Sequence, residues 1–191
     1  MASLLDGLMQ QMSGDTMAQL SAAIGADQKT TSKAVGAALP AILGALALNA
    51  KSPEGAGALA SALDRDHDGS VLNDIPAMLG AGGGAAILSH IFGAKQGTVA
   101  QGVGAAAGLD GAQSGQLLAM LAPMVMGMLG AAKKSGGLDA GGLASMLGQE
   151  RSALPTQAGG PLGSLMQLID QDHDGSVIDD IGGMLGKLMG R

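Results

Sequence analysis

The sequence predicts an all-α protein. Apolar residues recur every three to four positions through most of the chain, and runs of β-branched or aromatic residues that would form strands are nearly absent. Because 47% of the residues are hydrophobic but only 1% are aromatic, leucine, methionine, isoleucine and alanine must fill the core. The 34 glycines favour short helices or helices that pack closely. They amount to more than twice the usual share of about 7%.

The first two helices are predicted before residue 26. The segment from Met1 to Met17 contains Asp6 and Asp15 and lacks a basic start, so we expect a packing helix and not a secretory signal. A second helix should follow Asp15 and end at Gly25. The inward-facing residues of these two helices are expected to be Leu4, Leu5, Leu8, Met9, Met12, Met17, Leu20 and Ile24.

The next two helices have recognisable starts. Asp27 is predicted to cap a helix that runs to about Ala50, with a kink or break at Pro40. The sequence Ser52-Pro53-Glu54 supplies a cap and a proline in the first turn, so a further helix should begin there and run to Leu63.

The chain also contains an internal duplication. Gly25-Ala26-Asp27 matches Gly108-Leu109-Asp110, and Pro40 matches Pro123, both at a separation of 83 residues. Residues 57–63 match residues 141–147 at a separation of 84. We therefore expect two related Gly/Ala/Met-rich helical units that pack together.

The predicted domain boundaries follow from this repeat. Residues 1–147 should form the duplicated helical domain, with copies at about 20–80 and 103–147. Residues 148–163, which contain Pro155 and Pro161, are typical of a linker. Residues 164–191 should form a C-terminal hairpin of an acidic loop and a helix.

Two acidic loops, at residues 64–74 and 170–180, carry the clearest chemical signal. Each has the pattern D-x-D-x-D-G-S-V. Alternate carboxylates in such a loop point toward one centre, and the glycine permits the turn that brings the next carbonyl into the same shell. Hard oxygen ligands on a flexible loop suit Ca²⁺ better than Mg²⁺. The candidate ligands are Asp64, Asp66, Asp68, Ser70 and Asp74 in the first loop, and Asp170, Asp172, Asp174, Ser176 and Asp180 in the second.

The loops are EF-hand-like but differ from the EF-hand at their ends. Position 12, where an EF-hand has a bidentate glutamate, holds Ile75 or Ile181. We expect Asp74 and Asp180 to be the last ligands of the two loops, in place of that glutamate. Asn73 and Asp179 are the alternatives. Because aspartate has a shorter reach than glutamate, we expect weak binding, with Kd on the order of 10⁻⁴–10⁻³ M.

A plain acidic turn is the competing interpretation of each loop. A turn needs only one aspartate and the glycine, whereas several converging carboxylates repel one another unless a cation lies among them. This repulsion favours calcium binding. His67 and His173 lie between ligand positions and should point outward.

Other chemistry has little support in the sequence. The chain has no cysteine, which excludes disulfides and thiolate sites, and its basic residues are scattered without stacking aromatics, which argues against nucleic-acid binding. Residues 80–85 fit the dinucleotide pattern G-x-G-x-x-A, but no strand precedes them. No cofactor other than calcium is expected.

His90 and a methionine-rich run each have two interpretations. His90 lies among apolar residues and is expected to be packed and hydrogen-bonded; the alternative is a catalytic role with an unidentified partner. The methionines of residues 117–129 should fill the core, although such residues also form adaptable binding surfaces. Residues 113–132 are uncharged, but their polar residues and Pro123 argue against a membrane span.

Several of these segments resemble the bacterial domain-of-unknown-function family 937. The resemblance rests on Ile24-Gly25-Ala26-Asp27, on residues 38–46 (ALPAILGAL), on residues 87–93 (ILSHIFG) and on residues 121–127 (LAPMVMG). It covers most of residues 20–147, and the acidic loop is also similar to loops in members of that family. The resemblance implies a small bacterial all-helical protein and brings no established activity.

From the residues we expect a non-enzymatic calcium-binding structural or interaction module. Two bound ions would change the formal charge from −6 to −2, which would ease self-association, so a homo-oligomer or another protein is the expected partner. A membrane-associated helical bundle and an enzyme that uses His90 are the alternatives. The sequence does not assign a compartment: the protein is either cytoplasmic or exported without a classical signal.

Overall fold

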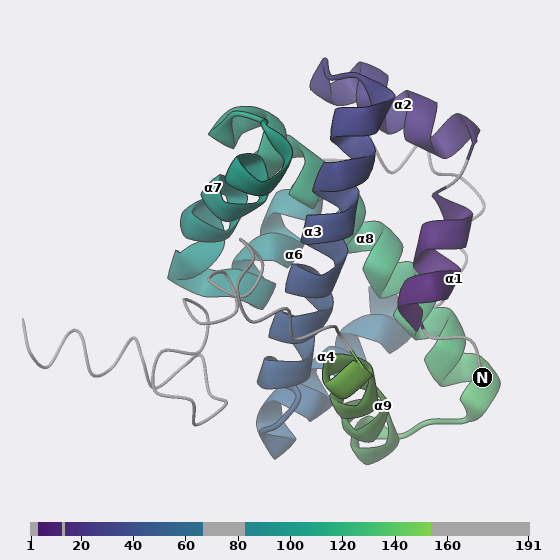
Figure 1. The fold of residues 1–191 in the computed structure, drawn as a ribbon. Coiled ribbons are helices and arrows are strands. Elements are labelled where there is room, and N and C mark those ends of the chain that lie inside the picture. The colour runs from purple at the N-terminus through teal and green to yellow at the C-terminus, as the bar shows by residue number, and fades with distance from the viewer. Residues whose placement is uncertain (1–3, 13, 67–82, 154–191) are drawn as a thin grey trace, which may run out of the picture.

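The computed structural model describes residues 4–12, 14–66 and 83–153, and every regular element in these ranges is helical (Figure 1). The predicted all-α class is confirmed for this part of the chain. Residues 67–82, which include most of the first acidic loop, and residues 154–191, which include the whole second loop and the predicted C-terminal helix, lie outside it.

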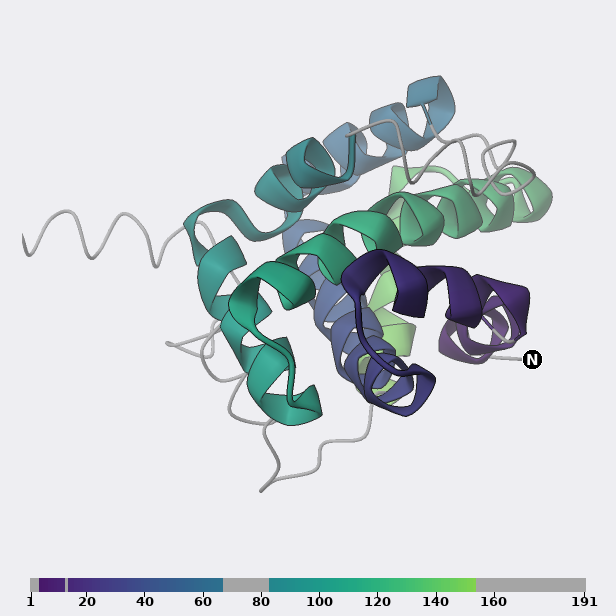
Figure 2. The same ribbon diagram turned by 90° about the horizontal axis from the view of Figure 1, so that it is seen from above.

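Two long helices form the centre of the protein. Helix α3 (Gln28–Asn49) and helix α8 (Gly111–Gly136) pack against one another, and between them they contact every other α-helix in the described ranges (Figures 1 and 2). The surrounding elements are α1 (Leu4–Gln11), α2 (Asp15–Ile24), α4 (Pro53–Asp66), α6 (Gly83–Phe92), the 3₁₀ helix η2 (Gly93–Lys95), α7 (Gln96–Ala107) and α9 (Ala140–Ala153).

The predicted start of α3 is confirmed. Gly25 ends α2 in the left-handed conformation, with φ of 67°. Asp27 then caps α3, because its carboxylate accepts hydrogen bonds from the backbone N–H groups of Lys29 and Thr30. The Thr30 hydroxyl donates a further hydrogen bond of 2.6 Å to the Asp27 carboxylate, and this bond is the main reason that the pKa of Asp27 is lowered. The cap is therefore ionised at neutral pH.

The start of α8 has the same local design. Gly108 ends α7 with φ of 84°, and Asp110 caps α8. Asp110 and Gln113 form a capping box, in which each side chain accepts a hydrogen bond from the other residue's backbone N–H. The Gln113 amide also donates to the Ile24 carbonyl at 3.0 Å, so the start of α8 is tied to the end of α2.

A kink or a break was predicted at Pro40; the break does not occur, because α3 continues through this residue. Proline has no N–H, and the carbonyl that loses its helical hydrogen bond is that of Gly36, four residues earlier. Gly36 is exposed, so water can satisfy this carbonyl. The helix therefore tolerates the proline, as α8 does at Pro123.

Two predicted helix ends are too early. Helix α4 starts at Pro53 as expected, and the Ser52 hydroxyl accepts a 3.0 Å hydrogen bond from the Gly55 N–H, but the helix continues past Leu63 to Asp66. Helix α9 continues through residues 148–153, where the sequence predicted the start of the linker. These residues include Gln, Glu and Arg, which favour helix. The remainder of the predicted linker lies outside the described residues.

The core is aliphatic, as the composition predicts. Leu39, Leu117 and Leu121 are fully buried, and Phe92, the one aromatic residue of the chain, is 2% exposed. In the methionine-rich run, Met120, Met124 and Met126 are buried, which confirms their core role. Met9, predicted to face inward, is instead exposed. Adjacent residues of a helix point in different directions, and Leu8, the neighbour of Met9, points into the core.

Among the described residues, α3 and α8 are long and apolar enough to cross a membrane. In α3, 83% of the most apolar window is buried inside the protein, and in α8 the share is 67%. Burial of this kind is what core helices of a globular fold require.

Candidate functional site

The first acidic loop begins in the last turn of α4. Asp64 and Asp66, the first two candidate ligands, are helical, so the acidic sequence overlaps the end of α4. The Asp64 carboxylate pairs with the ammonium group of Lys133 in the last turn of α8, with 2.5 Å between Oδ1 and Nζ. This contact joins the end of α4 to the end of α8.

The two partners of this ion pair differ in exposure. The side chain of Lys133 is 15% exposed, whereas that of Asp64 is 64% exposed. The surrounding protein therefore restricts the side chain of Lys133 more than that of Asp64. A carboxylate has two oxygens and about four lone-pair positions, so one ion pair leaves Asp64 able to accept a second cation.

The first loop also has a defined position in the chain. The chain leaves α4 at Asp66 and returns to a described helix at Gly83, the first residue of α6. Both α4 and α6 pack against α8. The described part of this loop, Asp64 and Asp66, is thus attached to a helix that packs on α8.

Most of the predicted ligands lie outside the described residues. These are Asp68, Ser70, Asp74 and the alternative Asn73 in the first loop, and Asp170, Asp172, Asp174, Ser176, Asp180 and the alternative Asp179 in the second. Within residues 4–12, 14–66 and 83–153, no group of three or more His, Asp or Glu residues is placed to hold a metal ion.

His90 is not packed in the core, which corrects the expectation from its apolar neighbours. Helix α6 buries Gly84, Leu88 and Ile91, whose spacing of three to four residues defines the inner face. His90 lies on the other face and is exposed, as is Ser89. An apolar segment alone does not show which face of a helix a residue occupies.

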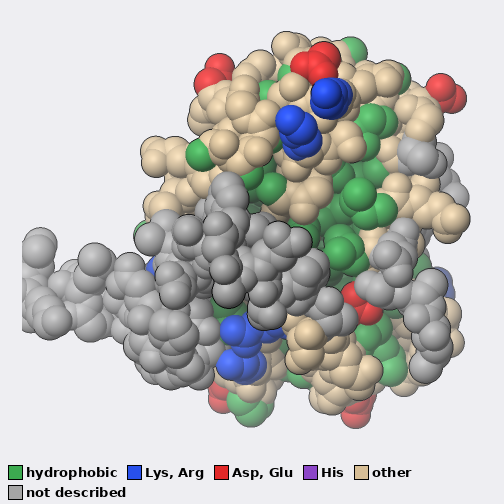
Figure 3. All heavy atoms as spheres, in the orientation of Figure 1, with side chains coloured by type: hydrophobic (Ala, Val, Ile, Leu, Met, Phe, Trp, Pro, Cys, Tyr) green, Lys and Arg blue, Asp and Glu red, His purple; other side chains and the backbone are tan. Residues whose placement is uncertain are grey.

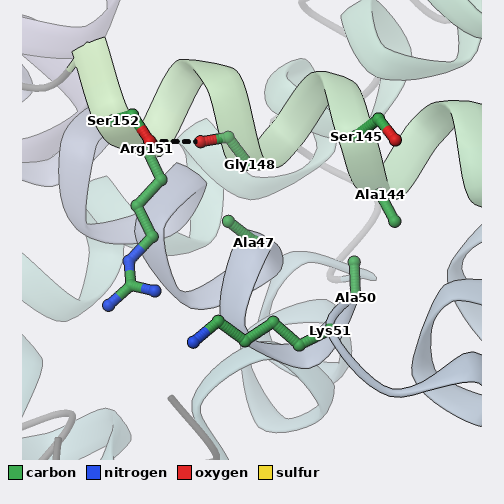
Figure 4. A pocket seen from close by; sticks show the side chains of 8 residues that line it. All are labelled: Ala47, Ala50, Lys51, Ala144, Ser145, Gly148, Arg151 and Ser152. Carbon is green, nitrogen blue, oxygen red and sulfur yellow. Dashed lines mark hydrogen bonds between the residues drawn. The ribbon is translucent and has the colours of Figure 1, made fainter. Parts of the chain in front are cut away.

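Sequence reasoning did not find two features that involve lysines. Lys133 is 69 residues from Asp64, so no local pattern pairs them. A pocket of about 520 Å³ between α3 and α9 is lined by both Lys51 and Arg151 (Figure 4). Its residues come from segments about 100 positions apart, and only the fold brings them together.

The sequence profile of a family described as bacterial protein of unknown function, DUF937, matches residues 6–132. The chain belongs to DUF937. No curated protein and no solved structure matches this chain. The DUF937 match covers α2 to α7 completely and α8 up to Ala132, so it includes the first acidic loop. The DUF937 match does not include helix α9 or the second acidic loop. It therefore includes only the α3 side of the α3–α9 pocket.

Proposed function

We propose that this protein is a non-enzymatic calcium-binding module with a structural or interaction role. The observation that carries the proposal is the repeated D-x-D-x-D-G-S-V pattern at residues 64–71 and 170–177. Converging carboxylates with a glycine turn are the oxygen-rich arrangement that Ca²⁺ prefers. In the first loop the ion would connect the end of α4 with the segment that leads into α6.

Repeated local geometry supports the view that the fold consists of two related units. Gly25 and Gly108 are both left-handed helix ends, and Asp27 and Asp110 both cap the long helix that follows. Each long helix carries a proline in its interior. We infer that α2–α4 and α7–α9 are copies of one unit, and that calcium, by reducing the net negative charge, favours self-association.

The test of calcium binding compares one ligand from each loop. If Ca²⁺ binds only the folded chain, it should stabilise the wild type by about 2.7 kcal/mol per site at a hundredfold excess over Kd. Asp68→Ala should remove more of this gain than Asp174→Ala, because the first loop follows directly on α4, which packs on α8, whereas the second loop follows the predicted Gly/Pro linker. Thermal melts followed by circular dichroism at 222 nm, with calcium or with chelator, measure the difference.

Asp15→Ala is the control variant, since Asp15 is an acidic residue in the first turn of α2 and belongs to neither loop. It should retain the full calcium-dependent gain whatever its effect on basal stability. Identical melting of wild type, Asp68→Ala and Asp174→Ala with and without chelator would show that the loops are ordinary acidic turns.

Lys133 gives a second prediction about the first loop. A positive charge paired with Asp64 opposes a divalent cation at the same carboxylate, at a cost of ~1–2 kcal/mol for charges about 5 Å apart in a highly screened environment. Lys133→Met, which keeps the packed aliphatic stem, should therefore tighten calcium binding at one of two sites about tenfold. Titration calorimetry resolves this change.

Lys134→Met provides the matched control, because it removes the neighbouring charge and leaves the Asp64–Lys133 pair in place. It should change the affinity less. Equal affinities for Lys133→Met and wild type would show that Asp64 is not a calcium ligand, even if both loops bind the ion.

A further inference from the structure

The two long helices have the same gap in their hydrogen bonding, but α6 covers only the gap in α8. Pro123 leaves the Ala119 carbonyl of α8 without its helical hydrogen bond, and Pro40 does the same to the Gly36 carbonyl of α3. Ala119 and Gly36 are separated by 83 residues, the separation that relates the two units. On α8, the backbone of Gly84 in α6 lies so close to the open carbonyl that a Cβ at Gly84 would collide with it.

The corresponding face of α3 is open in the described part of the chain. Gly36 is exposed, and a Cβ there would meet no described neighbour within 4 Å. Ala37 is only partly buried, whereas its counterpart Met120 in α8 is buried. Figure 3, in the orientation of Figure 1, shows a strip of hydrophobic side chains in the region between α3 and α1. We call the face of α3 that carries Lys33, Gly36 and Ala37 the α3 seat.

Helix α1 does not fill the α3 seat. It precedes α2 as α6 precedes α7, so the order of the chain makes it one possible occupant. It packs on α8 instead, where a Cβ at Gly7 would lie 3.7 Å from the sulfur of Met128. Gly36 stays exposed in the presence of α1. A different helix is therefore needed to complete the correspondence between the two units.

The acidic loops indicate which helix this is. The first loop follows the unit α2–α4, and the chain then enters α6, which packs on the long helix of the other unit. The second loop follows the unit α7–α9 and leads to residues 181–190, the predicted C-terminal helix. By the same relation, this helix belongs on the long helix of the first unit, which is α3.

The sequence and the length of the C-terminal segment agree with this placement. Gly84 of α6 is followed after three and seven residues by isoleucine, and Gly182 is followed at the same distances by leucine and methionine. The end of α9 lies beside Ala47 of α3, because Ser152 and Ala47 line the same pocket. From Ala47 back to Gly36 is roughly 17 Å along the helix. The 27 residues between Ala153 and the segment can span up to roughly 90 Å.

We propose that residues 181–190 dock as a helix in the α3 seat, in the way that α6 docks on α8. Gly182 faces the Gly36 carbonyl, and Leu185 and Met189 cover the apolar surface beside it. The two acidic loops then have one role, since each carries the chain to the long helix of the other unit. This proposal rests on the two-unit relation inferred above and not on calcium binding.

A spin label on the C-terminal segment tests the docking in the full-length chain. The chain has no cysteine, so Lys187→Cys provides a single attachment site for a nitroxide. In chelator, the nitroxide should remove the backbone amide NMR signals of Lys33, Gly36 and Ala37, and its reduction should restore them. The exposed Ser89 of α6 should keep its signal. Because calcium is absent, a negative result leaves the calcium proposal to its own melts and calorimetry.

Two substitutions at Gly36 provide matched variants of the labelled chain. Gly36→Arg places a long charged side chain in open space, so the fold should remain and the signals of Lys33 and Ala37 should return. Gly36→Ala should leave them suppressed, since α8 has alanine at the corresponding position and still admits α6. Full signals in the labelled chain without these substitutions, or equal signals in the two variants, would overturn the proposal. Loss of the signals from an isotope-labelled chain mixed with a spin-labelled one would also overturn it, because the docked segment would then come from a second copy.

Discussion

Phe92→Ala should lower the free energy of unfolding by about 4 kcal/mol, the range typical of a buried phenylalanine. Phe92 is 2% exposed at the end of α6, and it is the one aromatic residue in the chain. In a core otherwise built from small and aliphatic side chains, no neighbouring ring is available to fill the space that it would leave. Urea unfolding followed by circular dichroism at 222 nm measures the change.

Phe92→Leu is the matched control for this cavity. It keeps most of the apolar volume and should cost less than about 1.5 kcal/mol. If both variants lost the same free energy, the effect would come from the aromatic ring itself and not from the cavity. A loss below about 1 kcal/mol for Phe92→Ala would contradict the close packing of α6 against the core.

Gly84→Ala should cost about 3 kcal/mol by overpacking. Gly84 is buried where α6 crosses α8, and a Cβ there would lie 2.6 Å from the carbonyl carbon of Ala119 and closer still to its oxygen. The obstacle is backbone, so no side-chain rotation can relieve it. Because Pro123 has no N–H to donate to the Ala119 carbonyl, this is also the place where the hydrogen-bond ladder of α8 is open.

Gly36→Ala tests whether the cost depends on packing. Gly36 is an exposed glycine within α3, and a Cβ there would meet nothing within 4 Å. The substitution should stabilise the protein by up to about 1 kcal/mol, since alanine has the higher helix propensity. If Gly36→Ala destabilised the protein as much as Gly84→Ala, the cost would arise within each helix and not from the contact between α6 and α8.

Much of the helical order could be predicted because its signals are local. The aspartate that caps α3 and the glycine that ends α2 act within four residues of their own position, and both were found at the predicted places. The fate of Pro40 depended on whether the Gly36 carbonyl reaches water, which is a property of the fold. The ends of α4 and α9 were predicted too early, since helix-forming residues continue beyond the last apolar position.

The candidate sites were predictable to different degrees. A calcium loop is a contiguous pattern, so its ligands can be proposed from the sequence alone. The partner of Asp64 could not be proposed in this way, because Lys133 lies in another helix, 69 residues away, and no local sequence pattern relates the two residues. The inner face of α6 was also ambiguous, since Ile87, Leu88, Ile91 and Phe92 surround His90 on both sides in the sequence.

The central place of α3 has a consequence for how the chain folds. Its packing partners α7, α8 and α9 all follow much later in the sequence. Contacts between distant segments slow folding, because a long loop must close before they form. During synthesis, α2 can cover only part of the apolar surface of α3, and the rest stays exposed until α7, α8 and α9 have been made. A helical protein of this size is therefore expected to fold more slowly than a bundle of sequential hairpins, and to depend on chaperones during that interval.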